Sequence, residues 1–542
     1  MPPLPSGEPS HVVLEGSRRY HRAGSEVLGP ADPAQECDVI VKVRRKAELP
    51  EPDPARPISR ARLVADYGAD PADLDSVARV LTPLGLTVKS KDEATHSVEL
   101  TGSIAAMEAA FGVKLSEVRH DQQLYRGRVG PLHIPKELDG IVTGVFGLDT
   151  RPMIKHRRRH RKIVSAALPP ATSRPWFTPE ELAEAYHFPA GDGSGQTVAI
   201  LEFGGQYVAK DLQTFLGLVG LAAEKPSVLV RQVRALPPNE ASNPDATGEV
   251  MLDVEVVAGA CPKATIVVLF SPFTEAGWIA NIDAILTDPA HPSIASISYG
   301  LAEGSDIWTQ DAIDQVNDTL KALANAGITA CVSSGDDGSD DQVADGLAHV
   351  DFPASSPYVL AVGGTSLDKT TGEEVVWFEG DGLRRDGGGS TGGGVSAYSP
   401  RPSWQLQNVP SANPRGPAGR IVPDVAANAA GSTGYLLVAP DPQNPSKAAP
   451  QVAGGTSAAA PLWAALLARL AGAGKVIGFL PPKLYQASPT SAGQPVGSVA
   501  CRDITTGQNA SGTAPGYSAS VSFDAVTGWG SPIGDELLAR LP

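Results

Sequence analysis

Residues 197–203 read TVAILEF, a short and nearly continuous apolar run. Further runs of the same kind stand at ATIVVLF (264–270), IASISYG (294–300), TACVSSGD (329–336) and YVLAVGG (358–364). Helix-length segments such as residues 307–327 separate them. Apolar runs that alternate with helices predict a parallel sheet covered on both faces. In such sheets the reactive groups gather at the carboxyl ends of the strands.

Length and charge narrow the class of protein. A chain of 542 residues with 42% apolar and 19% charged residues fits a folded soluble protein of two domains. The first 170 residues hold 25 of the 44 basic and 22 of the 60 acidic side chains, so residues 171–542 carry a net charge of −19. Such an acidic surface disfavours nucleic-acid binding. Acid would relieve its self-repulsion, which favours an acidic working environment.

The front of the chain, residues 1–150, predicts a smaller α+β unit. The segments 38–45 and 96–102 have the pattern of strands, and the segments 70–85 and 103–112 that of helices. A linker follows at residues 151–176, where seven basic and no acidic residues up to Lys162 precede a Pro/Ala/Ser segment. A nucleic-acid patch is the less favoured interpretation, because no aromatic residues are interleaved. A second unit begins at residue 177, where Thr178 and Glu181 form a capping-box pattern.

The cysteine spacing indicates neither a zinc site nor a disulfide scaffold. The four cysteines show no CxxC spacing and are predicted to be buried free thiols: Cys37, Cys261, Cys331 and Cys501. No signal peptide and no membrane span is visible in the sequence.

Two acids stand four residues apart in GEVMLDVEVVAGACP (248–262). On a helix, Glu249 and Asp253 lie on one face with their carboxyl groups side by side. The neighbouring residues are too apolar for a solvated surface, which predicts a semi-buried pair that shares a proton. The alternative is an exposed acidic stripe on a surface helix.

The stretch GGTSAAAP (454–461) places Ser457 at the start of a helix, where backbone N–H groups favour negative charge. A helix-cap serine is the alternative. A nucleophilic serine needs a base, which is usually histidine. Residues 171–542 contain only His187, His291 and His349, and none has the HGT context of a subtilisin-type histidine.

Together these motifs resemble one family. GGTSAAAP, GEVxLDxE at 248–255, SSGDDG at 333–338, SISYG at 296–300 and STGGGVS at 390–396 are similar to the sedolisins, the serine-carboxyl peptidases. The resemblance runs from about residue 12 to the C-terminus, and the front unit resembles the family's prodomain. It implies a subtilisin-like doubly wound α/β catalytic domain over 177–542, a ferredoxin-like α+β prodomain over 1–150, and a processing site within 151–176.

The resemblance also implies roles. Ser457 would be the nucleophile, Glu249 the general base and later acid, and Asp253 the partner that orients Glu249 and holds its proton. Asp336 would line the oxyanion hole together with the backbone N–H of Ser457, and it must be protonated to donate. Its neighbour Asp337 is the rival for that role. A carboxylate base, with a reference pKa of about 4.3, suits an enzyme that works in acid.

Further positions are carried over from the resemblance. Glu202 would extend the proton network, with Tyr299 where a tryptophan is common in the family. Asp351 matches an acidic position on the wall of the substrate cleft, which indicates a basic side chain near the cut. One Ca²⁺ would bind the carboxylates of Asp503 and Asp524 and three backbone carbonyls, those of Ile504, Ser520 and Ser522. The family often has glycines at the two serine positions, and a turn-rich loop with incidental acids is the alternative.

The sequence therefore predicts a secreted, monomeric zymogen of an acid-acting endopeptidase. Its substrates would be polypeptides, its prodomain an intramolecular inhibitor removed autocatalytically at low pH, and neither nucleic acid nor membrane a partner. A catalytically silent relative would lack one of the four central residues, and all are present. An esterase would need a GxSxG elbow and a later histidine, whereas Ser457 lies in GTSAA with no histidine after it.

Overall fold

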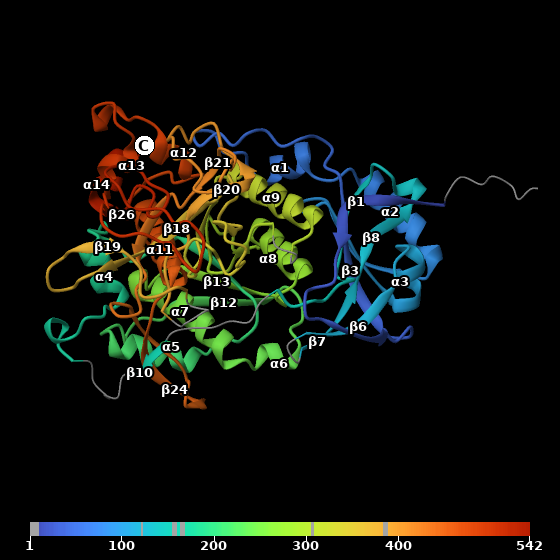
Figure 1. Ribbon diagram of the computed structural model, residues 1–542, viewed down its shortest axis with the longest axis horizontal. Helices are drawn as coiled ribbons and strands as arrows, with labels where there is room; N and C mark the ends of the chain where they lie inside the picture. Colours follow the sequence, from blue (N-terminus) through green and yellow to red (C-terminus); the bar gives the residue numbers. More distant parts are fainter. Residues whose placement is uncertain are drawn as a thin grey trace, which may run out of the picture.

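The computed structural model describes residues 10–120, 123–153, 160–162, 169–304, 308–382 and 388–541. Figure 1 shows a large body that contains the central sheet and a smaller N-terminal unit beside it. Among the described residues, no helix is both long and apolar enough to cross a membrane.

The central sheet has eight strands in the order β12-β13-β11-β14-β16-β18, with β22 and β19 both paired to β18. Only the β18–β19 pair is antiparallel. The bounds are β11 Thr197–Glu202, β12 Ser227–Gln232, β13 Thr265–Phe270, β14 Ile294–Ile297, β16 Thr329–Ser333, β18 Leu360–Leu367, β19 Glu374–Val376 and β22 Val425–Asn428. The predicted parallel sheet is confirmed. Strand β12 was not predicted, because it lies at the sheet edge and half of its residues are exposed to solvent.

Helices cover both faces of this sheet, as the apolar runs predict. Val198 and Ile200 of β11 join the core beneath α7 (Pro244–Ala260) and α11 (Thr456–Gly472). Ala199 and Leu201 join the opposite core beneath α8 (Glu275–Thr287) and α9 (Gln310–Asn325). Alternate residues of one strand therefore serve two separate cores, which is why the run is continuously apolar.

The N-terminal unit has the predicted ferredoxin-like arrangement. Its antiparallel sheet has the order β4-β5-β3-β9, and its helices connect β3 to β4 and β5 to β9. The strands are β3 Glu36–Val43, β4 Thr87–Asp92, β5 Ser97–Ser103 and β9 Val142–Phe146, and the main helices are α1 Arg60–Tyr67, α2 Pro71–Leu81 and α3 Ile104–Ala110. Strands β1 (His11–Arg19) and β8 (Gly130–Pro135) pair beside it, as do β2 (Glu26–Pro30), β6 (Leu115–His120) and β7 (Gln123–Arg128).

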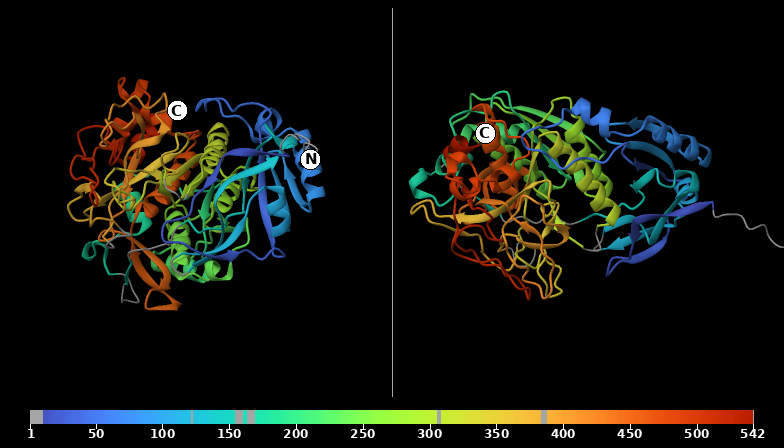
Figure 2. Two further views of the ribbon diagram at one scale, coloured as in Figure 1. Left: turned by 45° about the vertical axis from the view of Figure 1, so that its right-hand side comes forward. Right: turned by 90° about the horizontal axis from the view of Figure 1, so that it is seen from above.

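This unit docks on α8 and α9, and Figure 2 shows the contact from two further sides. The Lys42 ammonium lies 2.7 Å from the Asp283 carboxylate of α8. The Arg45 guanidinium lies 2.6 Å from the Asp318 carboxylate of α9. Arg60 of α1 donates to the carbonyl oxygens of Ile285 and Leu286 at the end of α8. Charged groups therefore fasten the unit to the two helices on one face of the sheet.

The predicted linker is described only in part, because residues 154–159 and 163–168 lie outside the described residues. The short strand β10 (His160–Lys162) pairs antiparallel with β24 at Gln451–Ala453. After it, α4 (Pro179–Ala185) opens with the predicted capping box, in which Thr178 and Glu181 bond reciprocally. The linker therefore reaches the strand that precedes α11.

The remaining elements complete the large body. They are α5 Ala209–Leu218, α6 Pro238–Ala241, β15 Leu301–Ala302, β17 Asp351–Phe352, β20 Gly394–Pro400, β21 Gly419–Val422, β23 Tyr435–Asp441, β24 Asn444–Ala453, α12 Pro481–Tyr485, α13 Val496–Ala500, β25 Cys501–Arg502, β26 Ser531–Pro532 and α14 Gly534–Arg540. All four cysteines are free and buried, as predicted.

Candidate active site

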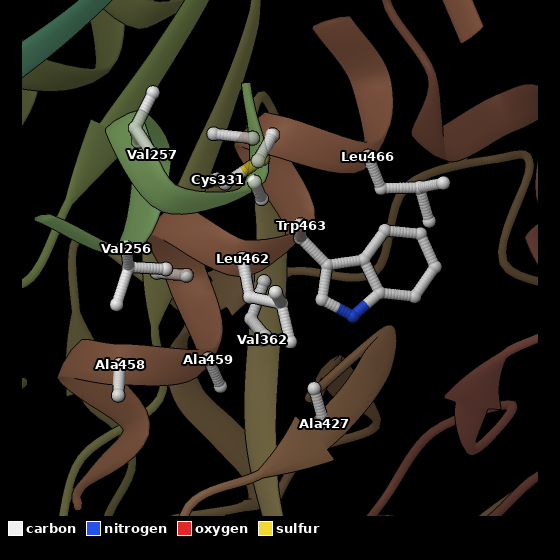
Figure 3. Packing of buried hydrophobic residues seen from close by; sticks show 14 of the residues in the cluster. Val256, Val257, Cys331, Val362, Ala427, Ala458, Ala459, Leu462, Trp463 and Leu466 are labelled. Atoms are coloured by element: carbon white, nitrogen blue, oxygen red, sulfur yellow. The ribbon is translucent and has the colours of Figure 1, made fainter. Parts of the chain in front are cut away.

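Ser457 is the second residue of α11, at the end of the helix that faces the carboxyl ends of the central strands. The turn before it needs Gly455, whose φ of 110° is rare for residues with a side chain. The helix is fixed in the core by Leu462, Trp463 and Leu466, seen in Figure 3, and the Trp463 Nε1–H donates to the Ala426 carbonyl oxygen at 2.9 Å. The Ser457 hydroxyl stays half-buried and lies 3.2 Å from the Ser298 carbonyl oxygen.

Asp336 follows β16 and lies against the residue before Ser457. Its Oδ1 accepts hydrogen bonds from the Thr456 N–H and the Thr456 hydroxyl, both at 2.7 Å. A Cβ added at Gly455 would lie 2.6 Å from Oδ2, so the glycine makes room for this carboxyl group. Burial raises the pKa of Asp336 to about 6 against these hydrogen bonds. The rival Asp337 instead accepts from the Gln342 side-chain amide at 2.9 Å.

The two predicted acids of α7 are buried, which makes the exposed-stripe alternative wrong. Glu249 is 5% exposed and Asp253 is 0% exposed. The Ser298 hydroxyl, just after β14, lies 2.6 Å from Asp253 Oδ2 and 3.1 Å from the carbonyl oxygen of Ser457. Burial, followed by neighbouring charges that include that of Glu249, raises the pKa values of both Asp336 and Tyr299.

The predicted outer pair is also in contact. The Tyr299 hydroxyl donates to Oε2 of Glu202, the last residue of β11, at 2.7 Å. Burial, followed by the charge of Glu202, raises the pKa of Tyr299 well above its usual value. The ring packs edge-on against Phe203, with centroids 5.1 Å apart. Tyrosine therefore supplies both the aromatic packing and a hydroxyl donor to the carboxylate.

Asp351 lies on β17, next to the strand ends that carry the other groups. It is 4% exposed. A Cβ added at Gly335 would lie 2.6 Å from its Oδ2, and one added at Gly300 would lie 3.1 Å away. The carboxyl group thus sits between the loop that carries Asp336 and the loop that carries Tyr299. It is buried beside the site, and its predicted role toward a substrate side chain stays a prediction.

No histidine of the large body shares this site. His187 and His291 are exposed. His349 has its Nε2 atom 2.9 Å from Asp345 Oδ1 in a surface turn. In the part of the chain that the structure describes, the titratable groups that contact residues 456–457 directly or through Ser298 are therefore the carboxyl groups of Asp336 and Asp253.

The predicted calcium residues are brought together by a loop near the C-terminus. Asp503 Oδ2 accepts from the Ser522 N–H at 2.8 Å, and Asp524 Oδ2 accepts from the Ser520 N–H at 3.0 Å. Ser522 has a φ of 73°, the conformation in which the family often has glycine. The described residues contain no cluster of three or more His, Cys, Asp or Glu side chains that could hold a metal. A cation here would therefore depend on backbone carbonyls such as that of Ile504.

Two contacts at this site were not predicted from the sequence. Ser298 bridges Asp253 and Ser457, and Thr456 anchors Asp336. Both lie within motifs that the sequence analysis singled out, SISYG and GGTSAAAP. A motif gives no contact partners, however, and the partners here are 45 to 159 residues away along the chain.

Known proteins are similar to this chain over almost its whole length. Residues 238–487 match the subtilase family, and residues 50–151 match the pro-kumamolisin activation domain. The chain is 39% identical to kumamolisin from Bacillus sp. (strain MN-32), over 98% of this chain and 97% of that protein. It is 30% identical to sedolisin from Pseudomonas sp. (strain 101), over 80% and 73% of the two chains. A solved structure of Pseudomonas sedolisin, complexed with pseudo-iodotyrostatin, matches with a TM-score of 0.56 at 29% identity, covering 68% of this chain and 98% of that one.

Proposed function

The chain belongs to the sedolisin family of serine peptidases, and from this premise we propose that it is the zymogen of an acid-acting endopeptidase with Ser457 as nucleophile. Residues 1–150 would be the prodomain, 151–176 the linker that is cut, and 177–542 the mature enzyme. Polypeptides would be its substrates, and the prodomain its intramolecular inhibitor until acid triggers self-cleavage.

In the proposed reaction a carboxylate takes the place of imidazole. As the Ser457 Oγ bonds to the scissile carbonyl carbon, its proton moves to Glu249, and Asp253 shares that proton. Glu249 then returns the proton to the leaving amine as the C–N bond breaks, which leaves an acyl-enzyme. Water attacks the ester by the same route, with Glu249 again as base, and releases the serine.

Asp336 would stabilise the oxyanion. Its Oδ1 is occupied by the two donors of Thr456, so Oδ2 is the oxygen left to carry a proton. A protonated Oδ2 and the Ser457 N–H can both donate to the negative oxygen of the tetrahedral intermediate. Because the pKa of Asp336 is raised to about 6, the acid form persists in mildly acidic solution.

One observation carries the proposal: two carboxyl groups from different elements converge on residues 456–457. Asp336 contacts Thr456 directly, and Asp253 reaches the Ser457 carbonyl through Ser298. Neither packing nor helix capping requires two buried acids at one helix start. Hydroxyls and N–H groups are the partners shown at these contacts, which keeps the acids available to hold and move protons.

Self-processing tests this proposal. The wild-type zymogen, Ser457→Ala and the control Ser446→Ala, whose side chain is exposed on β24, are shifted from pH 7 to about pH 4 and followed by intact mass. We expect the wild type and the control to lose the prodomain by a cut within 151–176, and Ser457→Ala to remain whole. Equal processing of the Ser457→Ala variant would exclude the assigned nucleophile.

We further propose that one Ca²⁺ stabilises the C-terminal loop. Two carboxylates from Asp503 and Asp524 supply charge, and the carbonyls of Ile504, Ser520 and Ser522 supply the neutral oxygens that hard cations prefer. Asp524 is buried and its carboxylate is held by backbone N–H groups, so a nearby cation would offset its desolvation. The ion would have no part in peptide cleavage.

Chelation separates this site from a simple turn. We expect a calcium chelator to lower the unfolding temperature of the wild type, and added Ca²⁺ to restore it. Asp524→Asn should have a lowered temperature that no longer responds to chelation. An identical melting curve with and without chelator would disprove the site.

The working location follows from the pH range. We propose that the mature enzyme acts as a monomer in an acidic extracellular setting, because its charge and its carboxyl chemistry both favour low pH. Detection of the processed form in culture medium, but not in washed cells, would support this location, and the reverse distribution would count against it.

A further inference from the structure

Ser298 stands between the two halves of the catalytic centre, and nothing in its motif assigns it a role. Its hydroxyl oxygen lies 2.6 Å from Asp253 Oδ2 and 3.1 Å from the Ser457 carbonyl oxygen. In return, the Ser457 hydroxyl lies 3.2 Å from the Ser298 carbonyl oxygen. The side chain is 7% exposed, so bulk water does not compete freely for these contacts.

The carbonyl of Ser457 needs this donor because of a proline. In an α-helix the carbonyl of residue 457 accepts from the N–H of residue 461, and here that residue is Pro461, inside α11. Proline has no N–H, so the helix cannot satisfy this carbonyl. The Ser298 hydroxyl occupies the place of the missing donor.

A hydroxyl has one hydrogen, and Ser298 has two acceptors. When Asp253 is ionised, the hydrogen is best given to the carboxylate, because hydrogen bonds to a charged oxygen are the stronger ones. Once Asp253 shares a proton and loses its charge, Oδ2 becomes the weaker acceptor. The hydroxyl hydrogen then turns to the Ser457 carbonyl oxygen.

We propose that Ser298 is a positioning residue for the shared proton: its one hydrogen serves Asp253 in the resting enzyme and the Ser457 carbonyl once Asp253 is protonated. The inference rests on the proposed function. When Ser457 gives its proton to Glu249 and Asp253 shares it, the hydroxyl of Ser298 rotates and the donor transfers to the turn that holds the nucleophile. No bond between heavy atoms forms or breaks in this rotation.

Acids and a phenol are the titratable groups that the structure places around Asp253: the charges of Glu202, Glu249 and Asp253 all raise the pKa of Tyr299, after burial. Glu249 lies one turn away on α7, Glu202 ends β11, and Tyr299 follows Ser298. Asp336 lies on the other side of Ser457. The pH dependence of the site is therefore a property of this acid cluster. Substitutions of Ser298 or Pro461 leave the acids unchanged, so they test whether the protonation of Asp253 is coupled to the start of α11.

A double-mutant cycle tests the coupling. Pro461→Ala restores an N–H for the Ser457 carbonyl, so the Ser298 hydrogen serves Asp253 at all times and favours the ionised acid. We expect the acid limb of the kcat profile to move to lower pH by about half a unit in the Ser298 background. In the S298A background the same proline substitution should leave the limb in place. A shift that is equal in both backgrounds, or absent from both, would overturn the inference.

Two controls separate hydrogen bonding from packing. Ser298→Ala should lower kcat about tenfold with little change in KM, and Ser298→Cys, which fills the space but donates weakly, should behave like alanine. Recovery by cysteine would show a packing role only. Ser296→Ala is the matched control, because Ser296 lies two residues earlier on β14, is 0% exposed, and its hydroxyl has no hydrogen-bond partner among the described residues.

The assay uses processed enzyme and a quenched peptide that the wild type cleaves. The Ser457→Ala zymogen accompanies each series. If that variant still cleaves, the proposed function fails whatever Ser298 does. If it is inactive and the Pro461→Ala shift does not depend on residue 298, the inference fails while the proposed function stands.

Discussion

The catalytic centre and the prodomain interface both bury carboxyl groups, but they neutralise them differently. At the interface two buried acids meet cations directly, Asp283 with Lys42 and Asp318 with Arg45. In the catalytic centre the acids meet hydroxyls, as in Asp253–Ser298 and Glu202–Tyr299. A cation holds an acid in its ionised form, whereas a hydroxyl can either donate to it or accept from it.

The difference appears in the pKa values of one aspartate from each region, Asp318 and Asp336. Burial alone would raise the pKa of Asp318, but His96 and Arg45 hold it well below its usual range. Burial raises the pKa of Asp336 to about 6, and the charges of Asp337 and Glu249 add to the rise. Aspartate is therefore held ionised at position 318, whereas at position 336 it can carry a proton in mild acid.

The sharpest test removes charge from the catalytic side. Asp253→Asn keeps an oxygen for Ser298 but cannot hold the proton of Glu249, so we expect kcat to fall by about 10³-fold. The unfolding temperature should change little, because the amide fills the same space. Peptide cleavage and thermal unfolding, each measured on purified protein, check the two statements. A variant that keeps most of its activity would place Asp253 outside the proton path.

The matching change at the interface should have the opposite consequence. Asp283→Ala leaves the Lys42 ammonium, which is 0% exposed, without its carboxylate. Breaking such a buried pair costs about 3 kcal/mol, which we expect as lost stability of the zymogen. Thermal unfolding in the Ser457→Ala background measures this loss without self-cleavage.

Two comparisons make the interface result specific. Asp53→Ala removes the exposed Arg56–Asp53 pair and should leave the unfolding temperature of the zymogen almost unchanged. Mature enzyme, once freed of its prodomain, should have the same kcat with Asp283→Ala as without it. A zymogen as stable as the parent would show that the ion pair does not hold the prodomain.

The comparison also explains what the sequence could predict. The parallel sheet followed from continuous apolar runs, because alternate residues of strands such as β11 enter two cores. The burial of Glu249 and Asp253 on one helix followed from helical spacing and apolar neighbours. Contacts that depend on distant residues did not follow, because Ser298 and Thr456 acquire their roles only when separate strands and helices meet. The edge strand β12 was missed for a different reason. Half of its residues are exposed to solvent, so its sequence has no long continuous apolar run.

Asp336, the proposed oxyanion-hole residue, leads to a prediction about the pH dependence of activity, with an effect of intermediate size. A carboxyl whose pKa is raised to about 6 is protonated below that pH, so activity should decline as the pH rises through about 6. Asp336→Asn cannot ionise and keeps N–H donors, so its profile should stay flat from pH 5 to 7 at a maximum about tenfold lower. Asp337→Asn, which contacts Gln342 instead, is the matched control and should retain the wild-type decline. A decline that persists in Asp336→Asn would assign it to another group.

The smallest effect concerns His96, an interface group that titrates opposite to Asp336. Its Nε2 lies 3.1 Å from Asp318 Oδ2 and 3.2 Å from the Gln315 amide nitrogen. Burial, and then the charge of Lys42, lower its pKa to about 4, with Arg45 adding to the shift and Asp318 opposing it. The folded zymogen therefore favours neutral histidine.

The sign of the His96 contribution follows from that shift. Histidine in the unfolded chain has a pKa of about 6.5, so the contribution of His96 to zymogen stability is complete above that value and is lost as the pH falls toward about 4. The loss amounts to about 1 kcal/mol for each pH unit in this window. His96→Gln should therefore flatten the fall in unfolding temperature of the Ser457→Ala zymogen between pH 6.5 and 4, while the exposed His21→Gln should leave it steep. Because the same fall in pH protonates Asp336, acid would loosen the prodomain and complete the oxyanion site together. Equal slopes in His96→Gln and the parent would leave the interface carboxylates as the sole source of acid release.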